Sequence, residues 1–186
     1  METTEKIVES YCRYVKNWFT IPNIKCQGQY EIDLLAVDTS KPELQRYHIE
    51  CGVSISGSYS KLTTKAFSTD DLKDRVKAAG QRRTLDYFIH RKFNIQEVVE
   101  KLQGYGFEPG NYQQIIVTWD ATEDARVEAQ KHGVIIWDLP NLLNEIANEH
   151  LQHRRYFTDD TARTIQLYAM AMNVNSSIRK NKVSDC

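Results

Sequence analysis

The spacing of apolar residues predicts a helix at the start of the chain. Apolar side chains recur every three or four positions over residues 7–18, so they form one stripe on an amphipathic helix. Thr3 or Thr4 is expected to cap this helix, and Pro22 is expected to end it. The stripe consists of Ile7, Val8, Tyr11, Val15 and Trp18.

Strand-like and helical patterns follow along the rest of the chain. Residues 29–38 and 46–55 are mostly apolar runs of strand length, and the short connection between them predicts an antiparallel hairpin. Polar residues 68–71 are a capping signal for a helix that continues through Leu72, Val76 and Ala79. Further helices are expected at 87–102, 121–132, 140–151 and 159–172, strands at 114–119 and 134–137, and a mobile polar tail at 173–186.

This order of elements predicts an α/β fold. Strand-helix-strand units need right-handed crossovers between parallel strands, whereas the hairpin near the N-terminus is antiparallel. A mixed β-sheet flanked by helices follows. The length of 186 residues predicts one domain over residues 1–150, and residues 151–186 are expected to add a C-terminal helix and a flexible polar tail.

Composition narrows the class of protein. With 41% hydrophobic and 26% charged residues, the chain is typical of a soluble globular protein, and disorder or membrane-spanning segments are not expected. The N-terminal residues show no secretion-signal pattern, so a cytoplasmic location is expected. The four cysteines are scattered without a CxxC pair, which argues against a zinc site or a disulfide framework.

Positive charge is concentrated in one segment of an otherwise near-neutral chain. Residues 73–92 contain seven basic and two acidic side chains, a local charge of +5, although the formal net charge of the chain is −1. Such a segment can contact phosphates, or it can be an ordinary solvated helix face. We expect nucleic-acid contacts from Lys61, Lys65, Arg75, Gln81, Arg82 and Arg83.

Two acids within the apolar strands are the most informative residues. Asp33 and Glu50 each interrupt a strand of the predicted hairpin. A single acid of this kind is often a rim residue that reaches solvent, but two neighbouring carboxylates repel each other unless a cation or a proton lies between them. Mg²⁺ or Mn²⁺ bound by oxygen ligands suits hydrolysis of a phosphodiester, so we expect Asp33 and Glu50 to be metal ligands and catalytic residues.

The arrangement resembles the PD-(D/E)XK, or restriction-endonuclease-like, nucleases. In that superfamily a helix carries Glu, a strand carries Asp and the next strand carries Glu-x-Lys. Here the corresponding residues are Glu5, Asp33 in Glu-Ile-Asp-Leu, and Glu50 in His-Ile-Glu-Cys-Gly. Residues 121–143 are similar to the closing helix-strand-helix of Mrr-like restriction endonucleases, so the resemblance covers about residues 4 to 150.

The resemblance implies an αβββαβ core and a metal-dependent DNA endonuclease. It also implies that Glu5 is a third metal ligand, although a Glu in the first turn of a helix is also a favourable partner of the helix dipole. Glu9 lies more nearly opposite the apolar stripe and is the weaker candidate. Because cutting two strands usually requires two such sites, the resemblance also implies a homodimer.

The chain departs from the superfamily pattern at one position. Where the motif has Lys, two residues after Glu50, this chain has Gly52. A lysine from elsewhere would have to supply the charge, and Lys73 or Lys77, which share one face of the helix expected there, are the preferred substitutes. Two hypotheses stay open: a metal-dependent nuclease acting on DNA, or a catalytically degenerate nuclease-like domain that binds nucleic acid or serves as a subunit of a larger complex.

Overall fold

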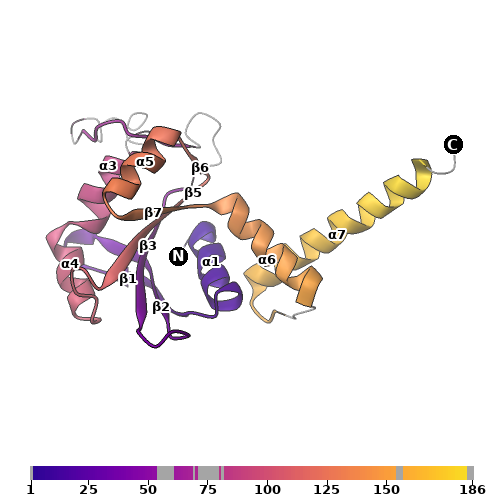
Figure 1. The fold of residues 1–186 in the computed structure, drawn as a ribbon, viewed down its shortest axis with the longest axis horizontal. Helices are drawn as coiled ribbons and strands as arrows, with labels where there is room; N and C mark the ends of the chain where they lie inside the picture. Colours follow the sequence, from indigo (N-terminus) through magenta and orange to yellow (C-terminus); the bar gives the residue numbers. More distant parts are fainter. Residues whose placement is uncertain are drawn as a thin grey trace.

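A mixed five-stranded sheet forms the centre of the molecule (Figure 1). The computed structural model describes residues 2–53, 61–68, 70, 80, 82–153 and 157–183. The strand order is β1-β2-β3-β5-β7; the first three strands pair antiparallel, and β3, β5 and β7 pair parallel. The predicted α/β class and the predicted hairpin are therefore confirmed. The strands span Phe19–Lys25, Glu31–Asp38, Gln45–Cys51, Tyr112–Thr118 and Val134–Asp138.

Helices cover both faces of this sheet. One face carries α1 (Thr3–Ser10), the π-helix η1 (Tyr11–Val15) and α6 (Leu139–His153), while α7 (Asp160–Val183) packs on α1 and α6 and extends away from the body (Figure 1). The other face carries α3 (Leu85–Tyr87), the π-helix η5 (Phe88–Phe93), α4 (Gln96–Gln103) and α5 (Glu123–Lys131). A short 3-10 turn, η2 (Gln27–Gln29), precedes β2, and β4 (Lys61–Leu62) pairs with β6 (Asp120–Ala121).

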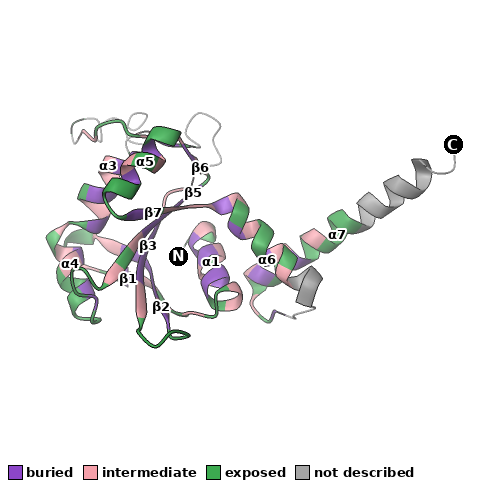
Figure 2. Ribbon diagram, viewed as in Figure 1, coloured by how far each residue is buried: buried purple, intermediate pink, exposed green. Residues whose placement is uncertain are grey.

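Successive side chains of a strand point to opposite faces of the sheet, so the core consists of two parts, one on each face. On β2, Leu34 and Ala36 pack toward α1 and α6, whereas Leu35 and Val37 pack toward α4. The central strands are buried almost throughout, as the purple ribbon of Figure 2 shows. Because both faces are covered, β2, β5 and β7 consist mainly of apolar residues, which is why sequence patterning identified them.

The structure corrects the expected N-terminal region. The helix begins at Thr3 without a cap from Thr3 or Thr4, and the Glu2 amide instead donates to Glu5 Oε2 at 2.9 Å. Pro22 does not end this helix; it lies inside β1, an edge strand that the sequence analysis did not predict. An edge strand tolerates proline because one side of its backbone has no strand to pair with.

Two further expectations differ from the structure. The helical pattern at 87–102 is broken between Phe93 and Gln96. Helix α7 continues through Val183 instead of ending near Met172, since no glycine or proline interrupts this segment. The helix expected through Leu72, Val76 and Ala79 lies outside the described residues. Among the described residues, no helix is both long and apolar enough to cross a membrane.

Candidate active site

The hairpin brings its two acids together at one end of the sheet. Leu34 pairs with Ile49 in the β2–β3 register, and the ladder ends next to them, where Asp33 and Glu50 lie side by side. The Cys51 amide donates to Asp33 Oδ2 at 2.7 Å, and the Asp33 amide lies 3.4 Å from Glu50 Oε1. Both side chains are buried. The carboxylates therefore converge as the sequence analysis expected.

Lys92 supplies positive charge to this pair. Its Nζ atom lies 2.6 Å from Glu50 Oε2 and 3.3 Å from Asp33 Oδ1. Lys92 comes from η5, 59 residues beyond Asp33 in the chain, and its side chain is only 21% exposed. One ammonium thus bridges the two carboxylates at the end of the sheet.

Gly52 lies directly against Phe88 of the helix that carries Lys92. A Cβ atom at position 52 would lie 2.3 Å from the Cζ atom of Phe88, so the aromatic ring occupies the space that a side chain at this position would need. Lys92 follows Phe88 by four residues in η5, about one helical turn. The same element therefore fills the space beside Gly52 and carries an ammonium to the acids.

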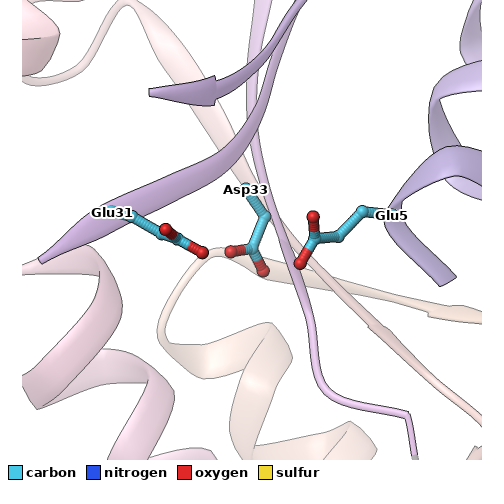
Figure 3. A group of neighbouring side chains, drawn as sticks. All are labelled: Glu5, Glu31 and Asp33. Carbon is cyan, nitrogen blue, oxygen red and sulfur yellow. The ribbon is translucent and has the colours of Figure 1, made fainter. Parts of the chain in front are cut away.

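A second group of acids lies next to the first. Oxygen atoms of Glu5, Glu31 and Asp33 all lie within 4.8 Å of one another (Figure 3). Glu5 reaches the group from α1, and Glu31 precedes Asp33 by two residues on β2. Three convergent carboxylates are the oxygen donors that a hard divalent cation prefers. Glu50 lies beside this set and faces Lys92 and His48.

Burial raises the pKa values of Asp33, Glu50 and Glu5. The pKa of Asp33 is raised to about 7, first by burial and then by the charge of Glu50, against the opposing effects of Lys92 and the Cys51 amide. Burial also raises the pKa of Glu50 to about 7, although Lys92 lowers it. The pKa of Glu5 is raised by burial and, more weakly, by Asp33 and Glu31. A bound cation would relieve this repulsion.

The pKa values of the two basic residues that contact the acids, Lys92 and His48, are shifted in opposite directions. Burial acts to lower the pKa of Lys92, but the charges of Glu50 and Asp33 outweigh it, so its pKa is raised and the ammonium stays charged. Burial lowers the pKa of His48 to about 3. The imidazole, whose Nε2 lies 2.8 Å from Glu50 Oε1, is therefore neutral near pH 7.

A cavity of about 340 Å³ gives access to the acids. Its wall includes Glu5, Glu31, Asp33 and Lys92, together with Arg82 and Arg83 from the segment before α3. Two of the arginines expected to contact nucleic acid therefore lie beside the carboxylates. A cavity lined by both acids and arginines can accommodate a phosphodiester and a divalent cation together.

The other expected residues have different positions. Lys73, Lys77, Arg75 and Gln81 lie outside the described residues. Lys61 pairs with Asp120 at 2.8 Å on the small β4–β6 ribbon.

Two further candidates, Lys65 and Glu9, do not belong to the group of acids at the site. Lys65 is exposed and, like Lys61, does not contribute to the cavity wall among the described residues. Glu9 pairs with Arg13 and accepts a hydrogen bond from Thr20, so Glu5 is the acid of the first helix that reaches the site.

Three residues of the site escaped the sequence analysis. Lys92 is one of the basic residues of segment 73–92. Its spacing from Phe88 indicates that it reaches the acids only once the structure has placed Phe88 against Gly52. Glu31 shares the parity of Asp33 on its strand, and His48 shares that of Glu50. Because alternate residues of a strand point to the same face, this spacing predicts that Glu31 shares a face with Asp33 and that His48 shares one with Glu50.

Neither a protein-family model nor a curated protein matches the chain. Among solved structures, the chain is similar to a protein of unknown function, AF1548, with a TM-score of 0.44 and 14% sequence identity over 99% of each chain.

Proposed function

We propose that the chain is a divalent-metal-dependent nuclease that hydrolyses phosphodiester bonds of DNA, with an active site of the PD-(D/E)XK kind. The observation that carries this proposal is the position of Lys92, whose ammonium bridges Asp33 and Glu50 at 3.3 and 2.6 Å. The missing lysine of the motif, at Gly52, was the main argument for a degenerate site. A lysine from η5 in contact with the same acids supports a catalytic site instead.

The donor set fits a hard divalent cation. Glu5, Glu31 and Asp33 would hold Mg²⁺ or Mn²⁺, since their oxygens converge and burial with mutual repulsion raises the pKa values of Glu5 and Asp33. When bound, such an ion polarises the phosphoryl group and lowers the pKa of the attacking water.

The chain's own residues position the phosphate and stabilise charge. Lys92 keeps its ammonium at the acids, where it can donate hydrogen bonds to the attacking water or to a phosphate oxygen. Arg82 and Arg83 present guanidinium groups on the cavity wall, where they can contact the phosphates that flank the scissile bond. Glu50 fixes Lys92 by ion pairing.

A cleavage assay with a matched pair of lysine variants tests the proposal. Wild-type protein is incubated with plasmid and with single-stranded DNA in Mg²⁺ or Mn²⁺, beside Asp33→Asn, Lys92→Met and Lys101→Met. Lys101 is an exposed lysine of α4, so its variant controls for loss of one positive charge. We expect Lys92→Met and Asp33→Asn to lower the cleavage rate by about 100-fold or more, and Lys101→Met to leave it unchanged.

Two outcomes would contradict the proposal. Cleavage that persists in both Asp33→Asn and Lys92→Met would mean that the activity arises elsewhere. A folded wild-type protein that cleaves neither DNA nor RNA with either metal would favour the nuclease-like binding domain without catalysis. Isothermal titration with Mn²⁺ on wild type and Glu31→Gln separately checks the metal ligands, since only the wild type should bind tightly.

A further inference from the structure

His48 is a buried residue of β3 that contacts the acid pair from behind. Its side chain is fully buried, and Nε2 lies 2.8 Å from Glu50 Oε1. The ring meets Phe93 edge-on at a centroid distance of 4.9 Å and lies tilted against Tyr112 at 6.3 Å. The described wall of the cavity does not include His48, so it acts on the site only through Glu50.

A hydrogen bond and an ion pair of Glu50 connect His48 to Lys92. His48 holds Oε1, whereas Oε2 faces Lys92 Nζ at 2.6 Å, and the same ammonium reaches Asp33 Oδ1 at 3.3 Å. When Glu50 is ionised, its carboxylate only accepts hydrogen bonds, so the neutral imidazole then carries its proton on Nε2 and donates a hydrogen bond to Glu50. His48 and the Asp33 amide therefore hold Oε1, while Oε2 forms an ion pair with Lys92, and these contacts together orient the carboxylate.

Packing alone does not account for a histidine at this position. With its proton on Nε2, the ring leaves Nδ1 as an acceptor, and Nδ1 has no hydrogen-bond partner among the described residues. A buried polar atom without a partner costs free energy that a leucine of similar size would avoid. The contact with Glu50 is the feature that only a donor at position 48 provides.

We infer that His48 is a positioning residue, which orients the Glu50 carboxylate so that the ammonium of Lys92 is held beside Asp33. Its consequence for hydrolysis rests on the proposed nuclease function, but the orientation of Glu50 and Lys92 does not. Loss of the donor leaves Glu50 Oε1 without its nearest partner and frees the carboxylate to rotate. The ammonium of Lys92 then loses its fixed place, while the arginines on the cavity wall are untouched.

Two substitutions at position 48 separate the donor from the packing. His48→Gln keeps an N–H donor near the Nε2 position, and His48→Leu keeps the volume without a donor. Leu102→Ala, in the buried face of α4 and away from the acids, is a control for general loss of stability. We expect His48→Leu to lower kcat by about 10- to 100-fold with little change in KM, and His48→Gln to retain kcat within a few-fold.

A measurement on the side chains themselves does not depend on catalysis. NMR of the Lys92 ammonium and of the Glu50 carboxyl carbon, without metal, reports whether the ion pair is intact. We expect slowly exchanging ammonium protons in wild type and His48→Gln, and fast exchange with a shifted carboxyl resonance in His48→Leu. Leu102→Ala should match the wild type in both signals.

The outcomes distinguish the two proposals. If the wild type cleaves no nucleic acid, the proposed function fails, and the NMR comparison still decides the role of His48. If His48→Leu has the wild-type ammonium and carboxyl signals, the positioning role is wrong. The same conclusion follows if His48→Gln loses as much as His48→Leu, because the donor would then not be the cause.

Discussion

Asp33, Glu50 and Lys92 form a group of two acids and one base at the end of the sheet. Because there are two carboxyls for one ammonium, the net charge of the group depends on pH. The ammonium cannot neutralise both carboxylates, and Glu5 and Glu31 add further negative charge nearby. Protonation or a divalent cation must supply the rest. The site is therefore stabilised by protons at low pH and, on the proposed function, by metal at higher pH.

The stability of the metal-free protein should fall as the pH rises from about 4 to about 7. Asp33 titrates near 3.8 when unperturbed and at about 7 in the folded protein, so between these values the folded state holds a proton that the unfolded state has lost. Glu50 contributes in the same direction. Urea unfolding at pH 5 and pH 8 measures the change in unfolding free energy.

Asp33→Asn is the control for this pH dependence. An asparagine resembles the protonated acid and does not titrate, so the variant should lose less stability between pH 5 and pH 8 than the wild type. Mg²⁺ should stabilise the wild type more at pH 8 than at pH 5, because it competes with protons for the same oxygens. Equal pH dependence in the two proteins would show that Asp33 is not the group responsible.

The acids of the site could be predicted from the sequence, but their basic partner could not. Asp33 and Glu50 stand out because each is charged within an apolar strand, and the strand pattern puts both at one hairpin. Lys92 is one of seven basic residues in its segment, and nothing local separates it from Lys73 or Lys77. Its role depends on a contact between segments far apart in the chain, which periodicity does not encode.

At the scale of secondary structure, the residue that follows β3, Gly52, packs directly against the helix η5. The ring of Phe88 lies where a side chain at position 52 would begin, and Phe88 is itself buried in the core beside α5. The wide turns of a π-helix are often found at functional sites, and here one of them carries Lys92. Packing at Gly52 and delivery of the ammonium are therefore coupled.

Gly52→Ala should destabilise the protein by about 1–3 kcal/mol, because the added Cβ would lie 2.3 Å from the Phe88 ring and the ring cannot leave a packed core. The unfolding free energy from urea titration measures this loss. In a Phe88→Leu background the same substitution should cost less, since the smaller side chain leaves room. Additive losses in the double variant would contradict a direct clash.

Element prediction succeeded where both faces of a strand are buried and failed at the edge. Strands β2, β5 and β7 are mainly apolar and lie close to the expected positions, whereas β3 begins where expected but ends at Cys51, before the expected end at residue 55. The edge strand β1 contains Pro22 and has Phe19 and Ile21 exposed, so it lacks both an apolar run and an unbroken backbone pattern. The π-helices η1 and η5 lie within the segments expected to be helical, although their turns are wider than the 3.6-residue period by which helices are identified.

For the whole molecule, the C-terminal region is divided into a part that completes the core and a part that extends beyond it. Phe157 and Ala162 are buried in the cluster beneath α1 and α6, and Ser10 donates to Asp159 Oδ1 at 2.9 Å. Farther along α7, Leu167 and Tyr168 are exposed. The boundary expected near residue 150 therefore falls within α6, and the core continues to the start of α7.

Changes in these two parts of the C-terminal region should affect the stability of the protein to different extents. Phe157→Ala should lower the unfolding free energy by about 3–5 kcal/mol, because it empties a buried site that Tyr14 lines at a centroid distance of 5.2 Å. A chain that ends at Asn173 should keep the wild-type Tm, since α7 is exposed at Met172 and Asn173. Thermal unfolding of both proteins provides the comparison; a large loss in the shortened chain would place stabilising contacts beyond Asn173.

The parallel pairing of β3 with β5 also has a consequence for the order of folding. The hairpin that carries Asp33 and Glu50 is local in sequence and can form early, whereas β5 must return across a long connection that contains Lys92. Non-local contacts of this kind form slowly because the loop must close before they contribute. We expect the hairpin to bring Asp33 and Glu50 together before burial raises their pKa values, and the ammonium of Lys92 to reach them only when the crossover docks, so the site is completed late in folding.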